Sequence, residues 1–147
     1  MSILALSGGV GGAKLALGLS RVMEPLDLTV VANTGDDFVH LGLPVSPDID
    51  TLVYTLAGLA NTELGWGRAG ETWAFMAALE ALGGETWFQL GDGDLAMHVE
   101  RGRRLAAGEG LGAITADISA RLGIEAAILP MTDDPVRTIV ETPGGPL

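Results

Sequence analysis

A glycine-rich turn near the N-terminus has the residues to bind an anion. Gly8, Gly9, Gly11 and Gly12 fall within five positions, and Lys14 follows them. Glycine allows positive φ and a close approach of backbone N–H groups to a ligand, and a helix starting here would add the positive end of its dipole. We expect Gly9, Gly11, Gly12 and Lys14 to bind a phosphate or diphosphate.

The turn differs from two well-known phosphate-binding patterns. A P-loop requires Gly before its lysine and Ser or Thr after it, but Ala13 and Leu15 stand there. The dinucleotide pattern Gly-x-Gly-x-x-Gly is met at Gly9 and Gly11 and broken at Lys14. An NAD-type oxidoreductase site is therefore one alternative, and a tight strand-to-helix turn without a ligand is another.

Carboxylates that could hold a metal ion follow in the next segments. Asp36 lies in a polar run that starts at Asn33, and Asp48 and Asp50 lie in the first turns of a predicted helix. Because the net charge is −11, a phosphorylated ligand needs a local cation, and Mg²⁺ would supply it. Asp36 is the predicted metal ligand, with a plain turn as the alternative.

The two helix aspartates are not expected to share one small ligand, because about 160° separates them around the helix. The helix dipole explains Asp48. Asp50 is explained less well by the dipole and is the candidate for function, with a solvated helix edge as the alternative.

The elements that would position these residues follow an α/β order. Apolar runs at 3–6 and 26–32 predict parallel strands around a helix, in a right-handed βαβ unit. Ligands bind beyond the carboxyl ends of such strands, so the glycine turn and the polar run should face one crevice. Strands are also predicted at 124–129 and 136–141. The fold class is α/β, a Rossmann-like parallel sheet with a helical insertion over the strand tips at about 47–122.

Within the insertion, helices are predicted at 71–82 and 92–107. Phe75, Leu79 and Leu82 would form the buried line of the first. Asp92 and Asp94 are assigned to the start of the second helix, and His98 to the core. A solvated face near the C-terminal end of that helix is predicted for Arg101, Arg103 and Arg104. His40 is predicted to lie on the surface.

Composition excludes several kinds of partner. With 19 acidic and 8 basic residues, the chain should repel nucleic acid and anionic membranes. No apolar run approaches the ~20 residues of a membrane span, and the N-terminus lacks a signal-peptide pattern. The absence of cysteine excludes disulfides and thiolate metal sites. We expect a cytoplasmic protein that binds neither nucleic acid nor a membrane.

Six motifs in register resemble the 2-phospho-L-lactate transferase (CofD) family. They lie at 8–14, 33–37, 46–56, 71–73, 87–92 and 129–134. The resemblance covers nearly all of residues 1–147 as one nucleotide-binding transferase domain. Family proteins are about twice this length, so the chain resembles their N-terminal half, without the C-terminal remainder.

The resemblance implies a magnesium-dependent transferase of coenzyme F(420) biosynthesis. A phospholactyl or phosphoenolpyruvyl group would pass from a GDP-linked donor to the ribityl hydroxyl of 7,8-didemethyl-8-hydroxy-5-deazariboflavin, releasing GMP. Mg²⁺ would neutralise charge and position the diphosphate. The motif match implies Asp36 and Asp50 as the catalytic and metal-binding carboxylates, Asp50 also on the acceptor side. It implies Asn33 and the glycine turn as the diphosphate site.

One position departs from the family pattern. Members typically carry Arg inside a Gly-Asp-Arg-Asp motif, where it helps to hold the acceptor, and this chain has Gly93 there. The motif implies Asp94 as a substrate-binding residue. Loss of a planar cation would change acceptor affinity or identity unless another residue compensates. A non-catalytic nucleotide-sugar-binding regulator is the main alternative, and a homodimer is left open.

Overall fold

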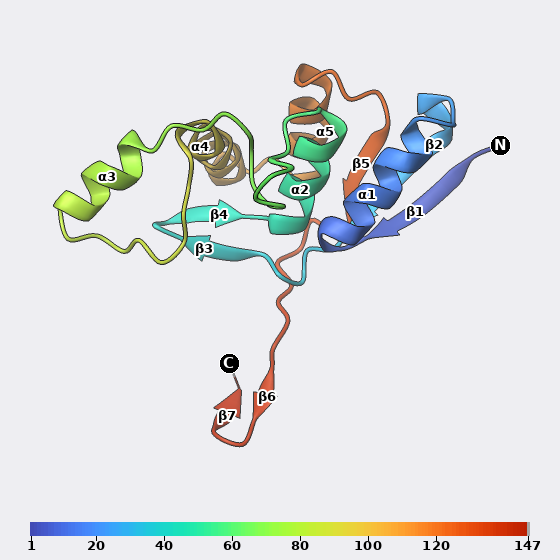
Figure 1. The fold of residues 1–147 in the computed structure, drawn as a ribbon. Coiled ribbons are helices and arrows are strands. Elements are labelled where there is room, and N and C mark those ends of the chain that lie inside the picture. The colour runs from blue at the N-terminus through green and yellow to red at the C-terminus, as the bar shows by residue number, and fades with distance from the viewer. Residues whose placement is uncertain (147) are drawn as a thin grey trace.

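A three-stranded parallel sheet stands at the centre of the computed structural model, which describes residues 1–146 (Figure 1). Its strands pair in the order β1 (Ile3–Ser7), β2 (Leu28–Ala32) and β5 (Ala127–Pro130). Ile3 pairs with Leu28, and Thr29 pairs with Ala127. The α/β class and the first two strands are confirmed, whereas the third starts at Ala127 and not at residue 124.

Helices cover one face of this sheet. These are α1 (Gly9–Ser20), α2 (Pro47–Leu56) and α5 (Leu111–Arg121). Ala13 and Ala16 are fully buried, and their small side chains let α1 pack closely in the core with Val30 and Leu52. Side chains alternate across a strand, and the other face carries the exposed Leu4, Leu6 and Leu129.

The helical segment lies between Pro47 and Arg121, close to the predicted 47–122, but its helices have two different positions. An apolar stripe that includes Ile49 and Leu52 buries α2 against the sheet layer, so α2 and α5 do not lie over the strand tips as predicted. Helix α4 (Asp92–Ala106) matches the predicted second helix and packs beside the hairpin β3 (Phe38–His40) and β4 (Leu43–Val45).

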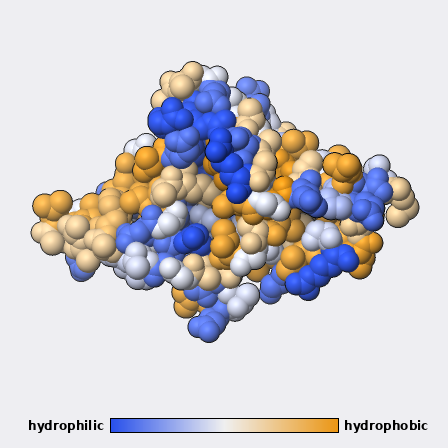
Figure 2. Space-filling view, turned by 90° about the horizontal axis from the view of Figure 1, so that it is seen from above, coloured by the Kyte–Doolittle hydropathy of each residue, from blue (hydrophilic) through white to orange (hydrophobic). Residues whose placement is uncertain are grey.

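Helix α3 (Ala74–Ala81) forms an arm at the left of Figure 1. It is shorter than the predicted 71–82, and Leu82 is 86% exposed, so the predicted buried line is wrong at that position. Met76 is the buried residue of α3, and Figure 2 shows apolar surface on this side of the molecule. His40 is also wrongly predicted: it is buried and packs edge-on against Trp87.

The C-terminal segment extends away from the sheet and ends in the hairpin β6 (Glu141–Thr142) and β7 (Gly145–Pro146) (Figure 1). The predicted strand at 136–141 is therefore wrong except at its last residue. A short 3₁₀ helix (Pro25–Asp27) precedes β2. Within residues 1–146, no helix is long and apolar enough to cross a membrane.

Candidate functional site

The glycine turn joins β1 directly to α1. Gly9 has φ +61°, which favours glycine, and its N–H donates a hydrogen bond of 2.7 Å to Asp48 Oδ1. A Cβ at Gly12 would lie 2.9 Å from Ser7 Cα, so Gly12 permits close packing of helix on strand. A Cβ at Gly11 would meet open space. Ligand contacts of these glycines stay predictions.

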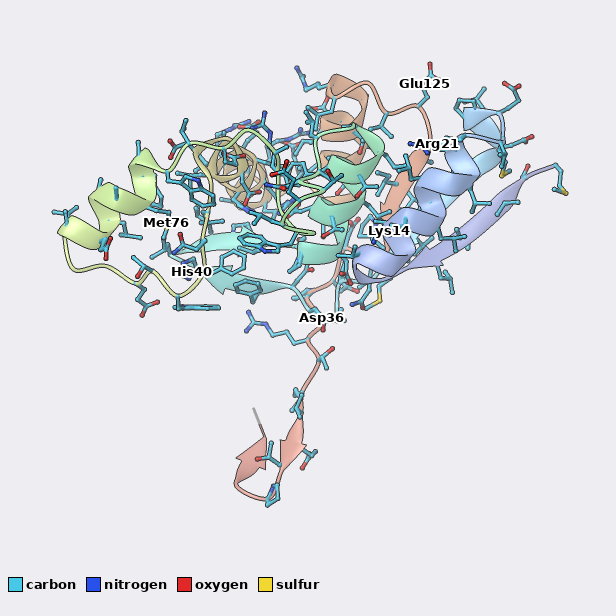
Figure 3. The ribbon with its side chains drawn as sticks, in the orientation of Figure 1. Lys14, Arg21, Asp36, His40, Met76 and Glu125 are labelled. Carbon is cyan, nitrogen blue, oxygen red and sulfur yellow. The ribbon has the colours of Figure 1, made fainter. Side chains whose placement is uncertain are left out.

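Three polar side chains, here called the Asn33 cluster, meet beside this turn: Asn33, Asp36 and Asp48. Asn33 Nδ2 donates to Asp36 Oδ2 at 3.1 Å and to Asp48 Oδ2 at 3.0 Å. The Asn33 side-chain oxygen accepts from Gly35 N–H, which fixes the orientation of the amide. Figure 3 shows Asp36 below the N-terminal end of α1. The glycine turn and the polar run therefore lie next to each other at the strand tips, as predicted, and a ligand crevice between them stays a prediction.

The chemistry of this cluster fits a divalent cation. Asp36 and Asp48 supply hard oxygen ligands on either side of one amide, and Asp36 is exposed to incoming ligands. Among the described residues 1–146, the donors to Asp48 are the neutral Gly9 N–H and Asn33 amide, and no salt bridge with a cation cancels its charge. No group of three or more His, Cys, Asp or Glu side chains within residues 1–146 is arranged around a common metal position. Other ligands would have to come from water or substrate.

Asp50 belongs to a separate group, here called the Arg101 network: Tyr54, Asp50, Asp94, His98 and Arg101. Arg101 Nη1 lies 3.3 Å from Asp50 Oδ2, and Arg101 Nη2 pairs with Asp50 Oδ1. Arg101 is only 2% exposed, so its assignment to a solvated face is wrong. His98 is buried, as predicted. Asp50 therefore forms an ion pair with a buried arginine, and its expected contacts with a metal and with the acceptor stay predictions.

Hydrogen bonds extend the Arg101 network to Asp94. His98 Nε2 lies 3.3 Å from Asp94 Oδ1, and the Tyr54 hydroxyl donates to the same oxygen at 2.5 Å. Burial opposes ionisation of Asp94, but the hydrogen bond and charge of His98 and the Tyr54 hydroxyl outweigh it and lower the pKa of Asp94. Burial, and then the charge of Asp94, raises the pKa of Tyr54. Asp94 is thus held as an anion at the start of α4.

Two neighbouring cavities lie beside the Arg101 network and share Asn61, Trp66 and Gly67. The larger, of 330 Å³, is also lined by Lys14 and Tyr54. The smaller, of 190 Å³, is also lined by Asp94, and both have aromatic walls. The structure therefore brings the predicted residues Lys14 and Asp94 to adjacent cavities, which could accept a planar ligand.

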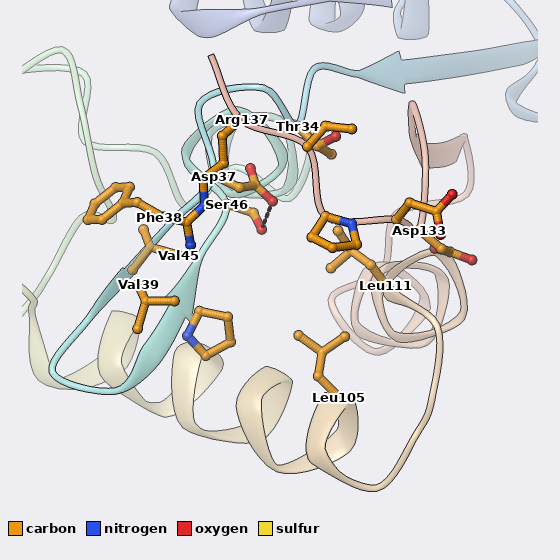
Figure 4. A pocket seen from close by; sticks show the side chains of 14 residues that line it. Thr34, Asp37, Phe38, Val39, Val45, Ser46, Leu105, Leu111, Asp133 and Arg137 are labelled. Carbon is orange, nitrogen blue, oxygen red and sulfur yellow. Dashed lines mark hydrogen bonds between the residues drawn. The ribbon is translucent and has the colours of Figure 1, made fainter. Parts of the chain in front are cut away.

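A third cavity of 270 Å³ lies between the β3–β4 hairpin and the C-terminal segment (Figure 4). Asp37 and Arg137 line it, and Ser46 Oγ donates to Asp37 Oδ2 at 2.7 Å. Burial raises the pKa of Asp37 to about 6, against the lowering effect of the Ser46 hydrogen bond. This carboxyl therefore titrates close to neutral pH.

The helices α3 and α4 cap one another through two acids. Asp92 accepts N–H groups of Ala74 and Phe75 at the start of α3, and Glu71 accepts those of Gly93 and Asp94 at the start of α4. Asp92 lies at the start of α4, as predicted, and it also caps α3. These caps satisfy N–H groups that helix starts leave unpaired.

Sequence reasoning missed two functional candidates here, Asp48 and Arg68. Asp48 was assigned to the dipole of α2, but it contacts the start of α1. The available signal was its place at the start of a helix that follows the strand tip. Arg68 lines the 190 Å³ cavity and lies against Gly93, which spacing alone does not indicate.

Comparisons with known proteins agree on one family. The family model of 2-phospho-L-lactate transferase CofD matches residues 3–146. A phosphoenolpyruvate transferase of Streptomyces griseus is 47% identical over 98% of this chain and 46% of its own length. A 2-phospho-L-lactate transferase of Methanospirillum hungatei is 37% identical over 97% of this chain and 48% of its own. The chain thus spans less than half the length of these relatives.

Proposed function

Because the chain belongs to the CofD family of 2-phospho-L-lactate transferases, we propose that it forms part of an enzyme that transfers a phosphoenolpyruvyl or phospholactyl group. The donor is linked to GDP, and the acceptor is the ribityl hydroxyl of 7,8-didemethyl-8-hydroxy-5-deazariboflavin. The acceptor hydroxyl oxygen bonds to the phosphorus that carries the transferred group and gives up its proton to solvent, the bond from that phosphorus to the GMP oxygen breaks, and GMP leaves. The family consists of transferases, which disfavours the NAD-type oxidoreductase alternative.

The observation that carries this proposal is the Asn33 cluster at the start of α1. The N-terminus of α1 has open space beside Gly11, which favours binding of a diphosphate. The negative charges of Asp36 and Asp48 would repel that diphosphate. A divalent cation between carboxylates and diphosphate removes this conflict. When bound, Mg²⁺ would supply charge neutralisation and would orient the diphosphate.

We assign the metal to Asp36 and Asp48, while Asp50 acts through its neighbours. The sequence suggested Asp36 and Asp50, but both oxygens of Asp50 contact Arg101. Asp50 is better placed to hold Arg101, which contacts His98. In the same network, His98 contacts Asp94 at the acceptor cavity. Asp50 is therefore a proposed positioning residue, and Asp36 keeps its proposed catalytic role.

The acceptor ring would enter the cavities lined by Trp66, where Lys14 lines the larger cavity and Arg68, Glu71 and Asp94 line the smaller one. Aromatic walls suit a planar deazaflavin, and the polar groups at its edges would set its orientation. The donor diphosphate would lie at the glycine turn, about one helical turn before Lys14 in α1. Lys14 would then lie between donor and acceptor.

The decisive test is the Mg²⁺ dependence of GMP release by the whole protein, with acceptor and either GDP-linked donor. Asp48→Asn keeps an oxygen for Gly9 N–H but loses the charge, so the half-saturating Mg²⁺ concentration should rise at least about tenfold. Asp36→Asn should do the same. Glu125→Gln, an exposed carboxylate change outside the Asn33 cluster, is the matched control.

Unchanged Mg²⁺ dependence in both aspartate variants would remove them from the metal site. Absence of GMP release by the wild-type protein with both donors would contradict the proposed reaction. In that case, binding of a nucleotide-sugar without turnover would favour the regulator alternative.

A further inference from the structure

We propose that Arg68 binds an edge oxygen of the planar acceptor and that the missing side chain at Gly93 makes room for it. This inference rests on the proposed function. A Cβ at position 93 would overlap Arg68 Nη1 and would lie 3.0 Å from Arg68 Cζ. Only glycine therefore leaves the guanidinium its present place at the start of α4.

Arg68 is held from both ends. Its backbone pairs with Ala60 in an isolated antiparallel bridge, which closes the loop that carries Trp66. Its Nη1 donates to Glu71 Oε1 at 3.1 Å, and the Glu71 side chain is 5% exposed. Glu71 is itself fixed by the N–H groups of Gly93 and Asp94, at 2.6 and 3.0 Å. The guanidinium is thus positioned before any ligand arrives.

Most of the hydrogen-bonding capacity of Arg68 is unused. Within residues 1–146, the contact with Glu71 is its one side-chain hydrogen bond, and a guanidinium carries five N–H donors. The side chain is 31% exposed and lines the 190 Å³ cavity and a second cavity of 310 Å³. Donors that are fixed, charged and open to a cavity suit an incoming oxygen acceptor.

The surroundings of Arg68 define the class of ligand. Trp66 and Trp73 line the 190 Å³ cavity with Gln89, and both indoles are partly exposed. Such walls suit a flat heteroaromatic ring with carbonyl or anionic oxygens at its edge, which a guanidinium can bind through two parallel hydrogen bonds. The phosphates of the donor would lie elsewhere, at the glycine turn. Arg68 should therefore affect the acceptor and not the nucleotide.

The test is a titration of the deazaflavin acceptor, followed by its own absorbance, into the whole protein. Arg68→Gln should weaken acceptor binding at least about tenfold, while binding of GDP is unchanged. Arg68→Lys should recover only part, because an ammonium lacks the planar fork. Gly93→Ala should mimic Arg68→Gln by displacing the guanidinium, and it should add little in the Arg68→Gln background. Arg103→Gln, an exposed arginine of α4, is the control.

The outcomes separate this inference from the function on which it rests. If the wild-type protein binds no acceptor, the proposed function fails. If the wild-type protein and Arg68→Gln bind the acceptor equally, the inference alone fails. A lower melting temperature with unchanged acceptor affinity would limit Arg68 to support of Glu71, which also overturns the inference.

Discussion

Asp48 and Asp50 lie two positions apart on the first turns of α2 and are 8% and 6% exposed, but their neighbours differ in charge. Asp48 accepts from the neutral donors Gly9 and Asn33 in the Asn33 cluster. Asp50 pairs with Arg101 in the Arg101 network. The two carboxylates are equally buried, so the proposed assignment of the metal to Asp48 and not to Asp50 rests on the charge of their partners.

The largest effect on stability is expected from removing the cation of the Arg101 network. Arg101→Met removes the guanidinium that contacts both oxygens of the buried Asp50 and leaves the His98 imidazole, 3.9 Å from Asp50 Oδ2, as its basic neighbour; this should lower the free energy of unfolding by about 3–5 kcal/mol. The burial of Arg101 would lower its pKa, but the charge and hydrogen bonds of Asp50 outweigh this effect and raise it, so Arg101 is charged. Urea denaturation at neutral pH would measure the loss.

A double variant sharpens this prediction. Asp50→Asn combined with Arg101→Met removes both charges, so it should recover part of the stability lost in Arg101→Met. A loss below about 1 kcal/mol in Arg101→Met would contradict a buried ion pair and would make Asp50 as available to a metal as Asp48.

An intermediate effect on stability is expected at Asp37, whose pKa is shifted by charges of both the Asn33 cluster and the Arg101 network. Burial raises its pKa to about 6, Arg101 lowers it, and Asp50 and Asp48 raise it. The unfolded chain releases this proton near 3.8 and the folded chain near 6, so the contribution of Asp37 to stability falls as pH rises from about 4 to 6. Above pH 6 the cost is on the order of 1–3 kcal/mol.

Asp37→Asn should remove that cost. The variant should be more stable than wild type at pH 7.5, and the difference should vanish as the pH falls below 3.8, where wild-type Asp37 becomes protonated in both states. Thermal unfolding across this pH range checks the sign. A wild-type protein that instead gains stability between pH 4 and 6 relative to Asp37→Asn would show that the carboxylate is stabilised as an anion.

Local patterns predicted the first βαβ unit, α4 and the proximity of the glycine turn to the polar run, because strand alternation, helical period and strand-tip position are local properties. They failed for Arg101, since a cation near a helix end suits the dipole equally well in solvent or opposite a buried acid. The partner of Arg101 is Asp50, 51 positions away in sequence. Long-range charge pairs of this kind, and the contact of Asp48 with α1, depend on how the helices pack.

Arg103 provides the smallest expected effect and the matched case for Arg101. It lies two positions further along α4, where its side chain is 64% exposed and pairs with Glu100 at 2.8 Å. Both side chains stay solvated, and forming the pair costs them conformational freedom, so Arg103→Ala should leave the free energy of unfolding nearly unchanged. The same urea series measures both arginines. If Arg103→Ala costs as much as Arg101→Met, helix propensity or global charge would explain both losses, and the contrast between buried and exposed partners would no longer account for the difference between Asp50 and Asp48.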